Sequence, residues 1–173
     1  MEIINNNRLD DKQKIFFNKL KTYIGEPIYF YGSILRPDYT PKKSDIDTCI
    51  YTDNVQATCM KLQSFLKVDC NFKQVVWRFS HNSNMIYGKK MEYDSKNSGP
   101  IEISIYNSKD KDSVMKYHRD KIVLPIYVSI MMYILKMLYY HTFFIPKQVY
   151  KYMKNKLLTS AIGYPEQKFI IIK

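Results

Sequence analysis

Two aspartates, Asp45 and Asp47, flank a single apolar residue at the start of the run IDTCIYT, residues 46–52. This run alternates and is rich in β-branched and aromatic residues, which predicts a strand. Because alternate residues of a strand face the same side, the two carboxylates are expected to project together. Neighbouring carboxylates repel each other unless a divalent cation lies between them. Their oxygens suit Mg²⁺, which usually takes substrate phosphates as further ligands, although an isolated pair of this kind is also typical of a solvated strand end.

A phosphate-binding segment is predicted just before this strand. Gly32 and Ser33 end the apolar run PIYFYG, and eleven residues separate them from the first aspartate. A glycine lets the backbone approach a phosphate closely, and the serine hydroxyl and amide can donate hydrogen bonds to it. The same loop carries three cations that favour phosphate, or that are simply solvated: Arg36, Lys42 and Lys43.

The order of an apolar strand, Gly-Ser, a loop and then Asp-apolar-Asp resembles the signature of the nucleotidyltransferase superfamily that includes the family X DNA polymerases. It stands here as IYFYGS…SDIDTCI, and the resemblance covers residues 19–107. The resemblance implies transfer of a nucleotide from an NTP or dNTP, with two Mg²⁺ ions, or Mn²⁺ in their place. These ions stabilise the entering and leaving oxygens of an in-line displacement at the α-phosphate. It also implies that Gly32 and Ser33 hold the triphosphate, with Arg36, Lys42 and Lys43 as weaker candidates.

The same resemblance implies a third carboxylate on a later strand of the sheet. In PIEISIYN, residues 100–107, the isoleucines form one apolar face, so Glu102 faces the other way. The family more often has aspartate there, and Glu92 and Asp94 on the preceding hydrophilic run are rivals. The expected catalytic and metal-binding residues are therefore Asp45, Asp47 and Glu102. The resemblance assigns the two aspartates to the metal that binds the triphosphate, all three acids to the metal that activates the attacking hydroxyl, and the role of general base to Glu102.

The elements that must position these residues follow from hydrophobic periodicity and turn signals. A helix is expected over residues 9–24, with Asp10 or Asp11 as N-cap and a stripe of Ile15, Phe16, Leu20 and Ile24. Strands are expected in residues 27–32, 46–52, 72–80, 84–94 and 100–107, with a helix over 55–68 capped by Asp53 or Asn54. From residue 108 onward the pattern predicts helices, two of them starting at Pro125 and Pro146.

This order predicts an α+β fold: a mixed sheet of about five strands with helices on one side, followed by a C-terminal helical segment. The catalytic domain is expected over residues 1–120. Residues 121–173 are expected to form a helical, thumb-like segment packed on it as one unit. Its apolar run over residues 122–135 has 14 uncharged residues, too short for a membrane span of roughly 20 residues, so a helix buried between the sheet and another helix is expected.

The acceptor of the nucleotide is indicated by charge. The chain carries 27 basic and 16 acidic residues, a formal charge of +11, which favours a polyanion, although an AT-rich genome would also enrich lysine. Lys147, Lys151 and Lys154 recur at helical spacing and predict contacts with a nucleic-acid backbone. Tyr150 and Tyr152 accompany this stripe and could stack on unpaired bases. An amphipathic helix with solvated lysines explains the stripe equally well.

Two alternatives stay open at this point. One is a small nucleotidyltransferase that modifies a protein or a small molecule, similar to those that pair with a HEPN partner as antitoxins. The other is an inactive nucleic-acid-binding module on the same fold. In each case a protein partner or a homo-oligomer remains an option, and no membrane is expected.

The cysteines and the N-terminus indicate the compartment. Cys49, Cys59 and Cys70 are odd in number and lack the spacing of a zinc site or a disulfide framework, so reduced thiols are expected. The three histidines are scattered, which argues against a histidine metal cluster. The first 13 residues have no apolar segment typical of a signal peptide. These features predict a cytoplasmic protein.

Overall fold

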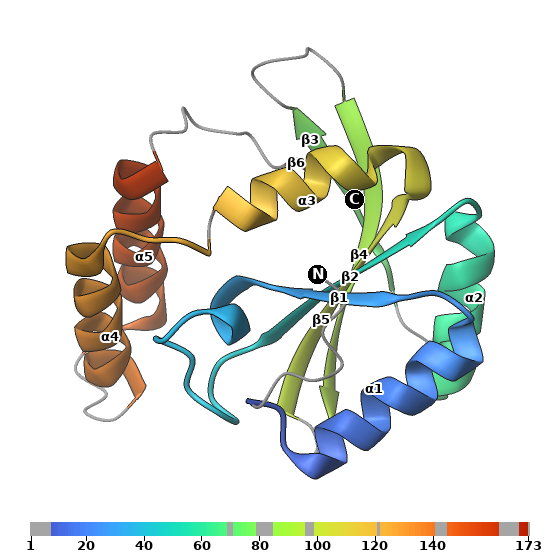
Figure 1. The fold of residues 1–173 in the computed structure, drawn as a ribbon, viewed down its shortest axis with the longest axis horizontal. Helices are drawn as coiled ribbons and strands as arrows, with labels where there is room; N and C mark the ends of the chain where they lie inside the picture. The colour runs from blue at the N-terminus through green and yellow to red at the C-terminus, as the bar shows by residue number, and fades with distance from the viewer. Residues whose placement is uncertain are drawn as a thin grey trace.

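A mixed β-sheet forms the centre of the computed structural model, which describes residues 8–68, 71–78, 85–95, 99–120, 122–140, 145–162 and 170–172. Figure 1 shows the sheet with helices on both sides of it and a helical pair at one end. The strands are β1 (Ile28–Tyr31), β2 (Ile46–Thr52), β3 (Lys73–Arg78), β4 (Met85–Ser95), β5 (Gly99–Asn107) and β6 (Ile170–Ile172). The helices are α1 (Asp11–Ile24), α2 (Val55–Leu66), α3 (Lys111–Asp120), α4 (Ile126–Tyr140) and α5 (Lys147–Ile162), with short 3₁₀ turns η1 (Gly32–Leu35) and η2 (Ser108–Asp110). The expected α+β fold is confirmed.

The strand order is β1-β2-β5-β4-β3-β6, and β2 with β5 is the parallel pair among otherwise antiparallel neighbours. Because β2 and β5 run parallel, Asp47 lies directly opposite Glu102. The sixth strand was not expected, since the sequence pattern predicted only helices after residue 108. Three consecutive isoleucines, with their β-branched side chains, favour this strand, which pairs with β3.

One face of the sheet is covered by α1 and α2 (Figure 1). Asp10 caps α1 in a capping box with Gln13, and Phe17 and Leu20 on this helix are buried in the main core. Leu20 and Ile24 of the predicted stripe are buried and Phe16 packs against the core, whereas Ile15 is 55% exposed and Phe17 is buried instead. Asn54, one of the two expected caps, accepts a hydrogen bond from the backbone N–H of Ala57 at the start of α2.

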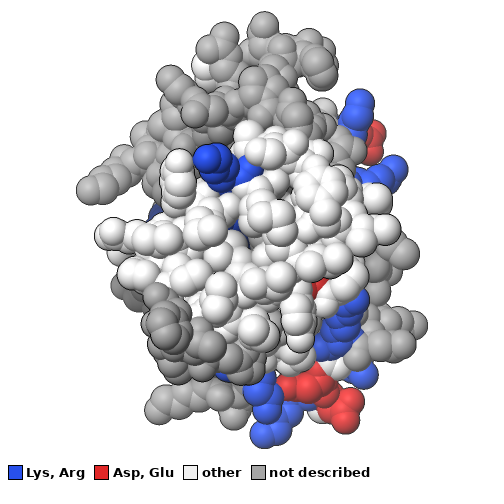
Figure 2. Space-filling view, turned by 90° about the vertical axis from the view of Figure 1, so that its left-hand side faces the viewer, with Lys and Arg blue, Asp and Glu red and all other residues white. Residues whose placement is uncertain are grey.

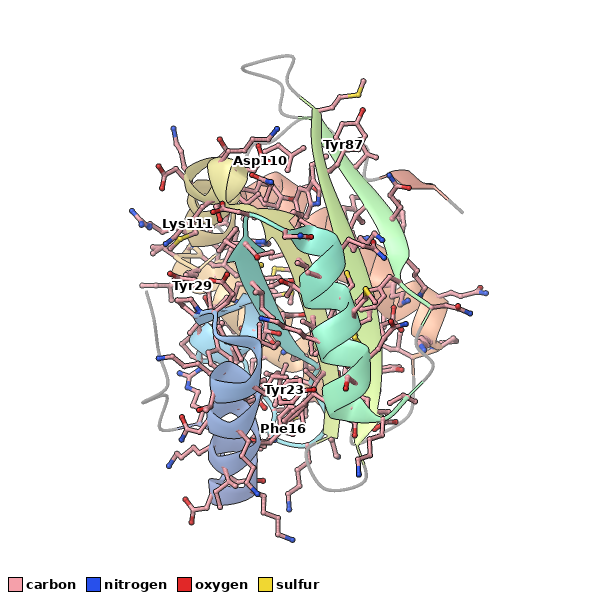
Figure 3. All side chains as sticks on the ribbon, turned by 90° about the vertical axis from the view of Figure 1, so that its right-hand side faces the viewer. Phe16, Tyr23, Tyr29, Tyr87, Asp110 and Lys111 are labelled. Carbon is pink, nitrogen blue, oxygen red and sulfur yellow. The ribbon has the colours of Figure 1, made fainter. Side chains whose placement is uncertain are left out.

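The opposite face is covered by α3, so the expectation that the helices lie on one side holds for α1 and α2 only. Val114 of α3 packs in a second core cluster with Cys49, Tyr51 and Tyr106. Lys111 at the start of this helix donates from Nζ to the hydroxyl of Tyr29 on β1 at 2.8 Å, a contact that can be followed in Figure 3. Asp45, Asp47 and Glu102 project from this second face, as the alternation of β2 and β5 predicted.

Helix α4 does not have the buried environment that its apolar sequence predicted. Its buried residues, Val128, Met132, Leu135 and Lys136, form a single stripe, while much of the remaining apolar surface faces outward, as at Ile126, which is 81% exposed. Figure 2 shows that the side of the molecule bearing α4 and α5 is largely uncharged, with charged residues towards its margins. Among the helices that the structure describes, none is both long enough and apolar enough to cross a membrane.

A buried ion cluster joins α4 to the loop that follows η1. The Lys136 ammonium lies 3.0 Å from Oδ2 of Asp38 and donates to the Asp38 carbonyl at 2.8 Å. Arg36 donates from Nε to Oδ1 of the same carboxylate at 2.8 Å. Burial alone would raise the pKa of Asp38, but the hydrogen bonds and charges of Arg36 and Lys136 outweigh it and hold this pKa below its usual value. The cluster therefore depends on an ionised Asp38.

The substitution Asp38→Asn is expected to lower the free energy of unfolding by about 3–5 kcal/mol, because it leaves two buried cations without a counter-ion. Chemical denaturation followed by circular dichroism measures this change. The matched control is Asp11→Asn, since Asp11 forms an ion pair with Lys14 on the surface and its side chain is 95% exposed. The control should change stability by less than about 0.5 kcal/mol, and equal effects of the two substitutions would contradict this role of the cluster.

Candidate active site

A cleft of about 1090 Å³ lies between the sheet and the helical pair of α4 and α5. Asp45, Asp47 and Glu102 line it from β5 and from the start of β2. Besides Glu92 and Asp94 of β4, the lining is mostly basic and aromatic, and comes from β3, β4, the helices and the loop before β2: Lys43, Lys73, Lys90, Lys136, Lys147, Lys151, Lys154, Trp77, Tyr93, Tyr117, Tyr139, Tyr140 and Tyr150. The structure thus brings the three expected acids together on one wall of a positively charged cleft.

Asp47 is the most deeply placed of these acids. Burial, followed by the negative charge of Glu102 on the adjacent strand, raises the pKa of Asp47 to about 7. Asp45 adds a further negative charge, while Lys154 and Lys90 act in the opposite direction. The parallel pairing of β2 and β5 therefore holds two acidic side chains side by side at considerable electrostatic cost, which is the arrangement expected of a cation-binding site.

Asp45 is the acid whose pKa responds to two lysines of the helical side of the cleft. Burial raises its pKa, Lys154 opposes this shift, and Glu102 adds to it. Lys147 also lowers this pKa, so two lysines of α5 act on an acid at the start of β2. The helical segment consequently contributes charge directly to the site.

The turn between β1 and η1 leaves room for the Asp47 carboxylate. Gly32 has a φ of +73°, and a Cβ atom built on it would lie 2.1 Å from Oδ2 of Asp47. A side chain at this position would therefore displace the acid, in addition to being strained by the left-handed backbone. The neighbouring Ser33 lines the cleft and is buried. The predicted reason for the glycine, close approach of a phosphate, is thus accompanied by a second one that sequence reasoning missed.

The third acid, Glu102, is held by two partners that the sequence analysis did not identify. The hydroxyl of Tyr31 on β1 donates to its Oε1 at 3.0 Å, and the ammonium of Lys90 on β4 lies 2.5 Å from its Oε2. The alternation of β4 offered a signal for Lys90, because residues 88, 90 and 92 of that strand face the same side as Glu102. The position of Tyr31 also follows from alternation, since its partner on β2 is Asp47.

The rival acids of β4 also line the cleft. Glu92 lies directly opposite Glu102 in the antiparallel pairing of β4 with β5 and forms an ion pair with Lys73. Its side chain is well exposed, and the Lys73 hydrogen bond lowers its pKa. Asp94 is exposed and lies further along the strand, opposite Pro100. Both acids are therefore more solvated than Asp47.

The three loop cations expected to hold phosphate have different environments. Arg36 is buried in its ion pair with Asp38 and does not line the cleft. Lys42 adopts a positive φ and is also absent from the cleft lining. Lys43 does line it, and its ammonium donates to the backbone carbonyl of Tyr140 at the end of α4.

The predicted lysine stripe of α5 faces the site. Lys147, Lys151 and Lys154 all line the cleft, together with Tyr150, whose ring stacks on Tyr139 of α4 with centroids 4.3 Å apart. Tyr152, the second expected stacking residue, is exposed and does not line the cleft. The three lysines therefore lie on the side of α5 that faces the cleft, while Lys147 and Lys151 are also exposed to solvent.

The donor set suits a hard divalent cation, because Asp45, Asp47 and Glu102 offer carboxylate oxygens on one wall and a phosphate ligand would have the lysines opposite. Within the described part of the chain, however, no three acids, histidines or cysteines are gathered closely enough to enclose a metal ion. In the structure both Glu102 oxygens are engaged instead by Tyr31 and Lys90. The three acids fit the cation chemically, provided that one oxygen of Glu102 gives up its present partner for the cation.

Comparisons with known proteins place this site in a family. Residues 12–123, well over half of the chain, match the nucleotidyltransferase domain family. No curated protein matches the chain. A solved structure described as "Structural Basis for the Activity of a Cytoplasmic RNA Terminal U-transferase" is similar, with 15% identity and a TM-score of 0.42. That similarity covers 78% of this chain and 43% of the other, so this chain spans less than half the length of the solved relative. The match over residues 12–123, which includes the Gly-Ser turn and both aspartates, confirms the resemblance seen in the sequence: the chain belongs to the nucleotidyltransferase domain family.

Proposed function

We propose that the protein is a metal-dependent nucleotidyltransferase that transfers a nucleotide from an NTP or dNTP to the 3′ end of a nucleic acid. The observation that carries this proposal is the pairing of Asp47 with Glu102 across β2 and β5, beside the Gly-Ser turn and opposite the lysines of α5. Such a site can accommodate a polyphosphate between a wall of acids and a wall of cations. The family match supports the reaction type.

The roles of the acids follow from their positions. Asp45 and Asp47 would hold the cation that accompanies the triphosphate, and both would share a second cation with Glu102. When bound, these cations neutralise the charge of the attacking and leaving oxygens. Glu102 accepts the proton of the acceptor hydroxyl, whose oxygen attacks the α-phosphorus while pyrophosphate leaves.

The triphosphate is held by the turn at the end of β1. Ser33 lines the cleft and donates from its hydroxyl and amide, while Gly32 keeps the backbone close and the Asp47 carboxylate in place. Lys43 is the one cation of the predicted loop set that lines the cleft, and we assign it to the phosphates. Arg36 stabilises the fold instead, through its buried pair with Asp38.

The size and lining of the cleft favour a nucleic-acid acceptor over a small molecule. Lys147, Lys151 and Lys154 extend along about two turns of α5 on the wall opposite the acids. Cations at this repeat suit a chain of phosphates, and the tyrosines beside them offer flat surfaces for unpaired bases. The alternative acceptors, a protein or a small molecule, do not require such a row.

The double substitution Asp45→Asn, Asp47→Asn is expected to reduce nucleotide incorporation to background, because it removes two carboxylates from the cation site without changing their size. The assay measures Mg²⁺-dependent incorporation of each labelled NTP and dNTP onto single-stranded and primed DNA and RNA. The matched control is Asp53→Asn, since Asp53 is exposed at the other end of β2 and does not line the cleft.

The preferred nucleotide and strand in this assay would define the substrate class. Retained incorporation in the double variant would contradict the assigned site. If the wild-type protein binds a triphosphate in a metal-dependent manner but extends no nucleic acid, the acceptor is a protein or a small molecule.

The α5 lysines are expected to set the salt dependence of nucleic-acid binding. Replacing Lys147, Lys151 and Lys154 together by Gln should reduce the slope of log K against log[salt] by about 2 for a single strand, since each phosphate contact contributes about 0.7. Fluorescence anisotropy with a labelled oligonucleotide measures this slope. The control replaces Lys12, Lys14 and Lys19 of α1, on the far face of the sheet, by Gln. This control should leave the slope unchanged. Equal slopes for both triple variants would contradict the assignment.

Asp47 is expected to make the stability of the metal-free protein depend on pH. Its pKa is about 7 in the folded protein against 3.8 for the free group, so between these values the folded state binds a proton that the unfolded state lacks. The contribution of Asp47 to the free energy of unfolding therefore falls as pH rises from about 4 to about 7. A divalent cation binds the ionised form and should raise the melting temperature more at pH 8 than at pH 6.

Thermal unfolding of the wild-type protein and Asp47→Asn, with and without Mg²⁺, measures both effects. The variant should be the more stable of the two proteins at pH 8 without metal. Mg²⁺ should raise its melting temperature by similar amounts at pH 6 and pH 8, whereas the rise for the wild type should be larger at pH 8. An Asp47→Asn protein that is less stable than the wild type at pH 8 would contradict the shift.

A further inference from the structure

Both carboxylate oxygens of Glu102 are occupied in the structure, although this acid is the third one assigned to the cation site. Tyr31 donates to Oε1, and the Lys90 ammonium lies 2.5 Å from Oε2. A neutral hydroxyl can stay beside a carboxylate that also binds a cation. The ammonium is a cation itself, so it occupies the position that a divalent cation needs.

The sheet keeps Lys90 beside Glu102. In the pairing of β4 with β5, Glu92 lies opposite Glu102 and Lys90 lies opposite Ser104, so Lys90 and Glu102 are diagonal neighbours on the same face. The side chains of Lys90 and Glu102 are each 20% exposed, and both line the cleft. The sheet therefore holds the two residues side by side, and the ion pair joins two side chains at the surface of the cleft.

A divalent cation shared by Asp47 and Glu102 would lie close to this ammonium, and the two like charges would repel each other. Lys90 therefore has to move before Glu102 can take part in metal binding. A phosphate oxygen in the cleft offers it a new partner, because the lysine head is a flexible point charge that binds phosphates well. Lys90 lines the same cleft that we assign to the triphosphate.

We propose that Lys90 is a positioning residue that acts as the internal counter-ion of Glu102, keeps a divalent cation away from this acid, and releases it when a substrate phosphate takes over the ammonium. This inference rests on the proposed function. A divalent cation would then bind to Glu102 only when substrate is present, so the full metal site does not form in an empty cleft. The ion pair takes part in the order of binding rather than in the transfer step.

The first test measures equilibrium Mn²⁺ binding by electron paramagnetic resonance, with the full chain and no nucleotide. Lys90→Met removes the charge and keeps the length of the side chain, and should bind Mn²⁺ about tenfold more tightly than the wild type. Adding Glu102→Gln to Lys90→Met should abolish this gain, because the released carboxylate is then absent. Lys90→Arg keeps the cation and should bind Mn²⁺ like the wild type.

The matched control is Lys89→Met. Lys89 is the neighbouring lysine, on the opposite face of β4, and its ammonium donates to Gln56 at 2.6 Å on α2. This variant should leave Mn²⁺ affinity unchanged. Circular dichroism of every variant establishes that it is folded, and Lys90→Gln provides a second neutral variant if Lys90→Met is not.

The second test measures the exchange to phosphate. Trp77 is the single tryptophan of the chain and lines the cleft, so its fluorescence reports triphosphate binding in the presence of a chelator. Without metal, Lys90→Met should bind triphosphate several-fold more weakly than the wild type, and Lys90→Arg should retain most of the affinity. Unchanged Mn²⁺ affinity or unchanged triphosphate affinity in Lys90→Met overturns the proposal.

These outcomes are distinct from a failure of the proposed function. If no variant binds Mn²⁺, both the function and this inference are overturned. If the expected Mn²⁺ and triphosphate pattern is found but no nucleotide is transferred, the function is overturned and the exchange of Lys90 between Glu102 and phosphate is supported.

Discussion

The parallel pairing of β2 with β5 fixes two acids next to each other, and much of the surrounding structure compensates for this constraint. Asp47 and Glu102 are direct partners in the register, so neither can move away without breaking the sheet. Burial, together with the repulsion from Glu102, raises the pKa of Asp47 to about 7. The same pairing buries Ile46 and Ile101 on the opposite face, where they pack under α1 and α2. The hydrophobic core thus holds the charged face in place.

The compensation comes from cations on separate elements. Lys90 reaches the acids from β4, and Lys147 and Lys154 reach them from α5. The lysines of α5 can act there because α4 and α5 pack on each other and because Lys136 fixes α4 to Asp38. A buried ion pair at the base of α4 therefore helps to position the cations of α5 in the cleft. This dependence explains why Arg36, which the sequence suggested as a phosphate ligand, is better placed as a partner of Asp38.

The sequence predicted the strands that carry the acids because each has a clear alternation with one apolar face. The residues 46–52 of β2 were predicted to the residue, and the isoleucines of β5 correctly indicated the direction of Glu102. Alternation within a strand does not reveal which strands are neighbours. The contacts of Tyr31 and Lys90 with Glu102 depend on the strand order, and for this reason they were missed. The buried pair of Arg36 with Asp38 was missed for a different reason, since Asp38 also pairs with Lys136 of α4, and the sequence does not show that this helix packs on the loop.

Helix α4 shows how a polar contact can override hydrophobic patterning. The helix is apolar on nearly all sides, which led to the prediction of a buried environment, yet only the stripe of Val128, Met132, Leu135 and Lys136 is buried. The one charged residue of the helix lies within this stripe. Because Asp38 is buried and fixed by Arg36, Lys136 must face it, and this requirement sets the rotation of the helix about its axis. Once that rotation is set, the other apolar residues point away from the sheet irrespective of their hydrophobicity, which accounts for the uncharged face over α4 in Figure 2.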